Sequence, residues 1–164
     1  MIAFLMSGWM AFHEVEARRA GPAERASPAV STRPTVLQSL VLASQGLLFI
    51  SESDAPFSPV DAPATPFASL DDATVRALAG HPAEDPVERI SVDYLFRNAV
   101  QQQPWHTPRE FEDVKRYQAL VALLHSTLPD AQVFRVGKIS IDVLILGTGP
   151  GGGALGLATK VVET

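Results

Sequence analysis

Cysteine is absent from the sequence, so disulfide bonds, thiolate metal sites and a cysteine nucleophile are excluded. Positive charge is also scarce: 13 Lys and Arg residues stand against 18 Asp and Glu residues, a formal net charge of −5. Such a balance provides no net attraction to nucleic-acid phosphates or to an anionic membrane surface. A cationic macromolecular partner fits this charge better than a polyanion does.

Long apolar runs are lacking as well. The first one, residues 2–12, is shorter than the roughly 20 residues that a membrane-spanning helix needs. No Lys or Arg precedes it and Trp9 interrupts it, which argues against a secretory signal peptide. We therefore expect a cytoplasmic protein that makes no contact with a membrane.

Domain organisation follows from length and composition. The 164 residues suffice for one compact domain with a tail. Residues 17–34 are mainly Ala, Arg, Glu, Ser and Pro, and such a segment buries too little apolar surface to offset the entropy lost on ordering. We therefore expect a flexible N-terminal extension over residues 1–34 and a folded domain over residues 35–164.

Four helices are predicted in the larger part of that domain, because apolar residues recur there at helical spacing after a start signal. The ranges and their capping residues are 35–45 (Thr35 and Gln38), 69–80 (Ser69 and Asp72), 91–100 (Ser91) and 107–128 (Thr107, Pro108 and Glu110). Between the first two helices the chain is rich in proline. Because proline cannot donate to a sheet ladder, we expect a stiff loop rather than a central strand around Pro56, Pro59, Pro63 and Pro66.

The spacing of apolar residues changes to two after residue 132, which indicates strands. Residues 133–136 and 139–146 are predicted to pair across a two-residue turn at Gly137 and Lys138. A third strand over residues 157–163 completes an antiparallel meander. One face of the second strand carries Ile139, Ile141, Val143 and Ile145. Helices followed by such a meander indicate an α+β fold in which helices cover the sheet.

Glycines crowd residues 147–153, from Gly147 to Gly153, directly after a predicted strand. A dinucleotide site of this kind also requires a helix after the glycines, whose N-terminus holds the phosphates, and a second strand with an acid. Only twelve residues follow Gly152, and they are predicted to form a strand. A hairpin loop is therefore the preferred interpretation. A flavin- or nucleotide-binding protein that uses this loop stays as an alternative hypothesis.

No catalytic or metal-binding arrangement is evident. The four histidines are far apart in the sequence, and no G-x-S-x-G motif is present. The acidic residues at 71–72 and 110–113 fall in the first turns of predicted helices, where negative charge complements the helix dipole. We therefore expect a protein that is not an enzyme, with no cofactor and no metal ion of its own.

Four segments, taken in order, resemble the nuclease A inhibitor family. They are residues 50–57 (ISESDAPF), the helical residues 114–117 (VKRY), the hairpin over residues 133–143 and the last six residues, TKVVET. The likeness covers about residues 36–164. It implies a small acidic protein with a three-layer α/β/α fold. It also implies inhibition of a sugar-non-specific DNA/RNA endonuclease whose active site uses a divalent metal ion.

The resemblance further implies a set of contact residues. In the family, contacts come from the Glu of an acidic S-E-S-D loop, from a Gln and a Trp two residues apart, and from the C-terminal Thr, which reaches the nuclease metal. The matching positions here are Glu52, Gln103, Trp105 and Thr164. The sequence departs from the family pattern at Ala55, Pro59, Pro63 and Pro104.

Elementary chemistry is compatible with this contact. A nuclease that grips phosphodiesters presents Lys or Arg and a hard cation, and such a cation prefers oxygen ligands. The last two residues, Glu163 and Thr164, offer carboxylates and a hydroxyl, so Glu163 joins the expected partner-binding residues. Trp105 is expected to act as an aromatic anchor, and Glu52 as an anion that faces a basic groove.

The resulting hypothesis is a bacterial inhibitor that blocks a metal-dependent endonuclease. We expect it to be a monomer or to form a 1:1 complex with that enzyme, and to contact no nucleic acid directly. An interaction module of the same fold without inhibitory activity is a further alternative.

Overall fold

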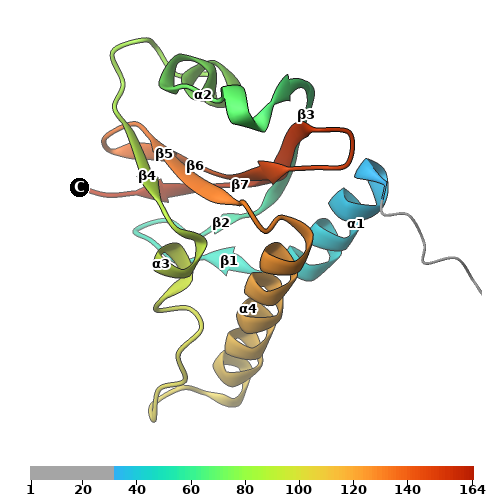
Figure 1. Ribbon diagram of the computed structural model, residues 1–164. Helices are drawn as coiled ribbons and strands as arrows, with labels where there is room; N and C mark the ends of the chain where they lie inside the picture. Colours follow the sequence, from blue (N-terminus) through green and yellow to red (C-terminus); the bar gives the residue numbers. More distant parts are fainter. Residues whose placement is uncertain (1–31) are drawn as a thin grey trace, which may run out of the picture. The chain divides into compact units, whose positions relative to one another are not determined.

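A five-stranded antiparallel sheet organises the computed structural model, which describes residues 32–164 (Figure 1). The strand order is β3–β7–β6–β5–β4, with bounds β3 Ser58–Pro66, β4 Val87–Ile90, β5 Gln132–Val136, β6 Ser140–Thr148 and β7 Gly153–Val162. A separate hairpin pairs β1 (Leu48–Phe49) with β2 (Ala55–Pro56). Strands β5, β6 and β7 form the predicted antiparallel meander, so the α+β class is confirmed.

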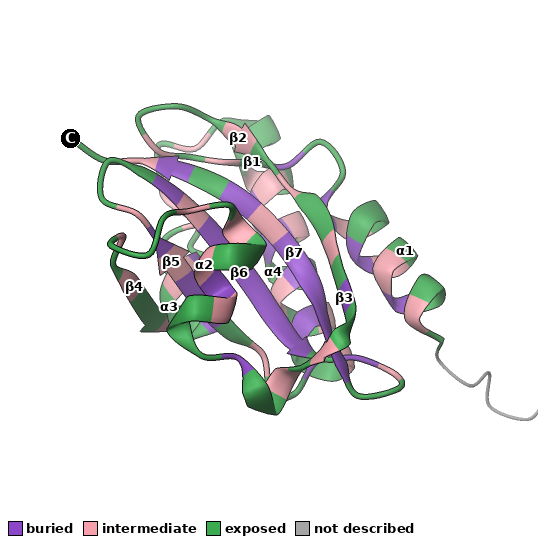
Figure 2. Ribbon diagram, turned by 90° about the horizontal axis from the view of Figure 1, so that it is seen from above, coloured by how far each residue is buried: buried purple, intermediate pink, exposed green. Residues whose placement is uncertain are grey.

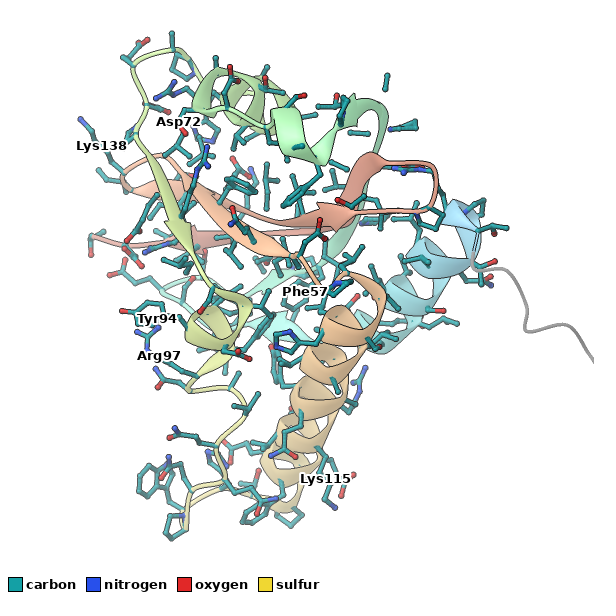
Figure 3. All side chains as sticks on the ribbon, in the orientation of Figure 1. Phe57, Asp72, Tyr94, Arg97, Lys115 and Lys138 are labelled. Carbon is teal, nitrogen blue, oxygen red and sulfur yellow. The ribbon has the colours of Figure 1, made fainter. Side chains whose placement is uncertain are left out.

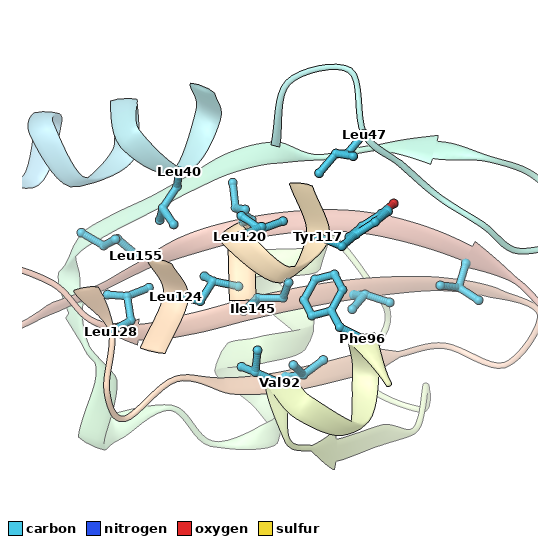
Figure 4. Packing of buried hydrophobic residues seen from close by; sticks show 14 of the residues in the cluster. Leu40, Leu47, Val92, Phe96, Tyr117, Leu120, Leu124, Leu128, Ile145 and Leu155 are labelled. Atoms are coloured by element: carbon cyan, nitrogen blue, oxygen red, sulfur yellow. The ribbon is translucent and has the colours of Figure 1, made fainter. Parts of the chain in front are cut away.

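Helices cover both faces of this sheet (Figure 1). On one face, α1 (Arg33–Ser44), α3 (Val92–Phe96) and α4 (Pro108–Thr127) contribute to a buried cluster with Leu40, Phe96 and Leu120 (Figure 4). On the other face, the 3₁₀ turn Phe67–Ser69 and α2 (Asp72–Ala79) close a second cluster that includes Val75. None of the helices described within residues 32–164 is long and apolar enough to cross a membrane.

Strand β6 is buried on both faces, as its colouring in Figure 2 shows. Alternate side chains of a strand point to opposite faces, so Val143 and Ile145 join the first cluster while Leu144 and Leu146 join the second. Ile139, expected in the same row as Val143, precedes the strand and is 63% exposed. The prediction for Ile139 is therefore wrong, because the strand begins one residue later.

Helix α4 begins as predicted. Thr107 accepts a hydrogen bond from the Glu110 backbone N–H, and the Glu110 carboxylate accepts one from the Thr107 N–H, which completes a capping box with Pro108 in the first turn. Helix α3 also has its predicted Ser91 cap, but it ends at Phe96 rather than at residue 100. Residues 97–100 form turns instead, and Gln118 Nε2 donates to the Val100 carbonyl at 2.9 Å.

Two other predicted caps are wrong by a few residues. Thr32, not Thr35, caps α1 by accepting a hydrogen bond from the Thr35 N–H at 3.4 Å. Asp71, not Ser69, caps α2 through the Thr74 N–H at 2.8 Å. Residues 32–34, expected in the extension, thus belong to α1 and its cap. Residues 1–31 of the expected extension lie outside the described residues.

The proline-rich segment forms strand β3, so the prediction of a loop is wrong. The strand lies at the edge of the sheet and pairs only with β7. Proline is tolerated on an edge strand because its missing N–H need not serve a second neighbour, so Pro59 and Pro63 are compatible with this position. The register shifts between Ala62 and Pro66, where a bulge ends regular pairing.

The predicted two-residue turn at Gly137 and Lys138 is also wrong. Strand β5 ends at Val136 and β6 begins at Ser140, so residues 137–139 connect them, and the last β5–β6 pair joins Val136 to Asp142. The Gly137 N–H donates to the Pro86 carbonyl at 3.1 Å instead of closing a tight hairpin. Pro86 directly precedes β4, a short edge strand that the sequence pattern did not predict because only Val87 and Ile90 of its four residues are apolar.

Candidate functional site

The chain end and the loop between β1 and β2 lie side by side. Ser51 Oγ accepts a hydrogen bond from the Val162 N–H at 3.3 Å and donates to the Ser53 carbonyl at 2.7 Å. The Thr164 hydroxyl donates to Glu52 Oε1 at 2.5 Å, and the Thr164 N–H reaches the same oxygen at 3.4 Å. Two of the predicted contact residues, Glu52 and Thr164, are therefore in direct contact.

Glu163 is held by a different set of groups. Arg135 of β5 is opposite Glu88 of β4 in the sheet, and its guanidinium donates to Glu88 Oε2 at 2.9 Å and to Glu163 Oε1 at 2.5 Å. The Glu163 N–H donates to the Ile139 carbonyl at 3.0 Å. The Glu163 carboxylate, expected to contact a partner, thus forms an ion pair with Arg135 within the chain, and this contact holds the chain end against the sheet.

Gln103 and Trp105 lie on a separate loop between α3 and α4, which runs away from the sheet in Figure 1. The Gln103 N–H donates to His106 Nδ1 at 3.3 Å, and the His106 N–H donates to the Gln103 carbonyl at 3.1 Å, so the turn around Pro104 is closed on itself. The Trp105 side chain is 76% exposed. It therefore contributes little to the core and is free to contact another molecule.

The His106 ring connects this loop to α4. It lies edge-on to Trp105 with 6.4 Å between ring centroids, and edge-on to Phe111 of α4 with 5.8 Å between centroids. Phe111 belongs to the first turns of α4, which the capping box fixes. Edge-to-face ring contacts therefore connect the exposed Trp105 to the start of α4.

A groove of about 980 Å³ runs between the β1–β2 hairpin, α3, the first half of α4 and the end of β7. Glu52, Glu163 and Thr164 line it, and so does His106 of the other loop, whereas Gln103 and Trp105 do not. The structure thus brings three of the five predicted residues together. The remaining two lie on the loop at the start of α4, which this groove also reaches.

Tyr117 of α4 lines the groove and is 6% exposed. Its hydroxyl donates to the Leu48 carbonyl, which ties α4 to the β1–β2 hairpin. Burial, followed by the negative charges of Asp113 and Asp54, raises the pKa of Tyr117 to about 12. The Tyr117 hydroxyl is therefore neutral at physiological pH. Sequence reasoning treated Tyr117 as a helix-face residue and gave no role to Asp54 or Arg135.

Residues 34–164 match the model of the family described as nuclease A inhibitor-like protein. The chain belongs to the nuclease A inhibitor-like family. Among curated proteins, no match to the chain was found. The family match extends from α1 through the last residue, so it includes the β1–β2 loop, the Trp105 loop and the chain end.

The glycine-rich segment of this nuclease A inhibitor-like protein is a hairpin loop between antiparallel strands β6 and β7. The Gly149 N–H donates to the Gly153 carbonyl at 3.0 Å, and the Arg33 guanidinium donates to the carbonyls of Pro150, Gly153 and Ala154. β7 rather than a helix follows the glycines, so the helix N-terminus that would bind a pyrophosphate is missing at this loop. Within residues 32–164, no three His, Asp or Glu side chains are grouped so as to hold a metal ion.

Proposed function

We propose that this protein inhibits a metal-dependent, sugar-non-specific DNA/RNA endonuclease by placing Thr164 at the catalytic metal ion of that enzyme. Membership of the nuclease A inhibitor-like family supports a nuclease as the partner. The single observation that carries the mechanism is the double hydrogen bond from Thr164 to Glu52, because it fixes the last residue on the surface of the domain. The oxygen atoms of Thr164 are suitable ligands for a hard divalent cation.

The fixed chain end matters for affinity. A flexible tail would have to be ordered on binding, and that entropy loss would be subtracted from the affinity. Here Val162, Glu163 and Thr164 all donate backbone hydrogen bonds within the domain before any partner is present. The inhibitor therefore presents Thr164 and Glu52 as one rigid unit, and both can occupy positions that substrate phosphate oxygens otherwise take.

Trp105 supplies the second contact in this proposal. An aromatic side chain that is 76% exposed on a fixed turn is suited to enter a pocket of a partner. Glu52 and Thr164 line the groove while Trp105 lies outside it on the loop before α4, so a 1:1 partner would be contacted at two separate surfaces. The inhibitor blocks the active site and carries out no reaction of its own.

The test is a titration of the full chain against a panel of metal-dependent endonucleases in Mg²⁺ buffer, with DNA and RNA cleavage as the readouts. We expect one enzyme to lose activity at equimolar inhibitor. Deletion of Thr164, or a short extension after it, is expected to weaken inhibition by about tenfold or more with no change in melting temperature. An extension at the N-terminus serves as the matched control and is expected to leave potency unchanged. Equal potency after deletion of Thr164 contradicts its contact with the metal ion.

A further inference from the structure

The groove beside the chain end carries an excess of negative charge that the fold does not use. Six carboxylate side chains and three arginines line it. Arg135 is committed to Glu88 and Glu163. Arg97 lies over the Tyr94 ring, 3.9 Å from its centroid, and donates to the Tyr94 carbonyl at 2.6 Å. Arg109 forms no ion pair within the described residues, and four of the six acids there have no ion-pair partner: Glu52, Asp54, Glu110 and Asp113.

Asp54 and Asp113 are the clearest case. Within the part of the chain that the structure describes, neither carboxylate forms an ion pair or accepts a side-chain hydrogen bond, although Asp113 is half-buried. The other acids of the same helix do have intrachain partners: Glu110 belongs to the capping box, and Glu112 pairs with Lys115 at 2.9 Å. Asp113 is also the sixth residue of α4, beyond the first turn in which we expected it, so the helix dipole stabilises it less.

The two carboxylates belong to opposite walls of the groove. Asp54 ends the loop between β1 and β2, and Asp113 lies on α4. Tyr117 lines the same groove and bonds to the β1–β2 hairpin, and the charges of both carboxylates raise its pKa while Arg116 lowers it. A cation that enters the groove at this position is therefore attracted from two sides.

Apolar surface accompanies these charges. Leu48, Ile50 and Tyr94 line the same groove and are 46%, 79% and 52% exposed. Lys and Arg side chains have this mixed character, because a charged head follows an apolar stem of several methylene groups. A free metal ion would use the carboxylates alone and would leave these three side chains in water.

We propose that the groove between the β1–β2 hairpin, α3 and α4 receives a Lys- or Arg-bearing segment of the nuclease, with Asp54 and Asp113 as its ion-pair partners. The inference rests on the proposed function and extends it. A nuclease that binds phosphodiesters carries basic residues around its active site, and the groove is continuous with Thr164, so one partner can fill both. Docking would give the half-buried Asp113 the cationic partner that it lacks within residues 32–164 of the free inhibitor.

The proposal predicts effects of opposite sign on affinity and stability. We expect Asp54→Asn and Asp113→Asn each to weaken binding of the nuclease by about tenfold, and the double variant to weaken it further and to reduce its salt dependence. The melting temperature of Asp113→Asn is expected to stay equal or to rise. Glu112→Gln is the matched control on the same helix. Lys115, the ion-pair partner of Glu112, lies on the other side of α4 from Tyr94 and Arg97 (Figure 3). The affinity of the Glu112→Gln variant for the nuclease is therefore expected to be unchanged.

Binding is measured by titration calorimetry with the nuclease that the inhibition panel identifies, and the oligomeric state of the free chain by sedimentation. Wild-type affinity in the double variant overturns the proposal, and so does a loss of affinity that parallels a fall in melting temperature. A wild-type dimer that the double substitution dissociates would assign the groove to a second copy and also overturn it. If these variants bind normally while deletion of Thr164 abolishes inhibition, only the groove proposal fails. If the wild-type chain inhibits no nuclease, the proposed function itself fails.

Discussion

Substitution of Arg135 by Met tests whether the chain end must be held in place. Methionine keeps an apolar stem of similar length and removes the guanidinium that bonds Glu88 and Glu163. The two carboxylates are 61% and 55% exposed, and exposed ion pairs of this kind contribute about 1 kcal/mol or less each to stability. We therefore expect the free energy of unfolding to fall by only about 1 kcal/mol.

The expected loss of affinity is larger than this loss of stability. Fixing the backbone of one residue costs about 1–2 kcal/mol, so two fully frayed residues, Glu163 and Thr164, would cost about 2–4 kcal/mol to reorder on binding. The bonds to Ile139 and Glu52 remain in the variant, and they limit the fraying. A loss of about 2 kcal/mol, or about 30-fold in the inhibition constant, is the expected result. Titration of nuclease cleavage gives the inhibition constant, and urea unfolding gives the stability.

Glu88→Gln is the control for this experiment. It removes the other partner of Arg135 and leaves the bond to Glu163, so stability falls slightly while potency stays near that of the wild type. Full potency of Arg135→Met would refute the idea that Arg135 positions the tail. Equal losses in Arg135→Met and Glu88→Gln would also refute it, because they would point to a general effect on the β4–β5 edge.

Two further predictions concern Trp105 and His81. Trp105→Ala is expected to cost about 2 kcal/mol or more of binding free energy, measured by calorimetry, without lowering the melting temperature, since the side chain is exposed; a lower melting temperature would make Trp105 a packing residue. His81 bonds Asp85 and Asp142, each at 2.6 Å, and these bonds raise the pKa of His81 above its ordinary value of 6.5. Stability from this cluster is therefore full below about pH 6.5 and is lost as pH rises through the raised pKa. Chemical unfolding at several pH values should show this slope in the wild type and a flatter one in His81→Gln.

The elements that the sequence predicted well are those encoded by neighbouring residues. The Thr107–Glu110 box and Pro108 determine the start of α4 within four residues, and the regular apolar spacing after them fixes its buried face. The meander was predictable because its strands follow one another along the chain. Strand β3 was not predictable, because its pairing with β7 joins residues about a hundred positions apart and because its prolines are typical of a loop rather than a strand.

The same distinction applies to the candidate site. The resemblance to a family placed Glu52 and Thr164 in one contact surface, and the structure brings these two residues together although 112 positions separate them in the sequence. No local pattern could have found Arg135, because its importance comes from facing Glu88 across the sheet and Glu163 from the chain end. The sequence held one signal for Asp113. It is the sixth residue of α4, beyond the first turn in which the helix dipole favours an acid.

The architecture explains how the last residues, the contact surface of the proposed function, are held in place. Terminal residues are usually poorly ordered unless a sheet holds them. Here β7 is an interior strand, and β6 pairs with it as far as Val162. On its other side, the pairing with β3 reaches Ala158. Beyond that residue the β1–β2 hairpin contacts β7, through hydrogen bonds from Thr159 to Ala55 and from Val162 to Ser51. The last two residues therefore extend from a strand that is held on both sides. Arg135 and Glu52 each fix one of these two residues, Glu163 and Thr164. Because the tail is already ordered, it loses less conformational entropy on binding than a flexible inhibitory tail would.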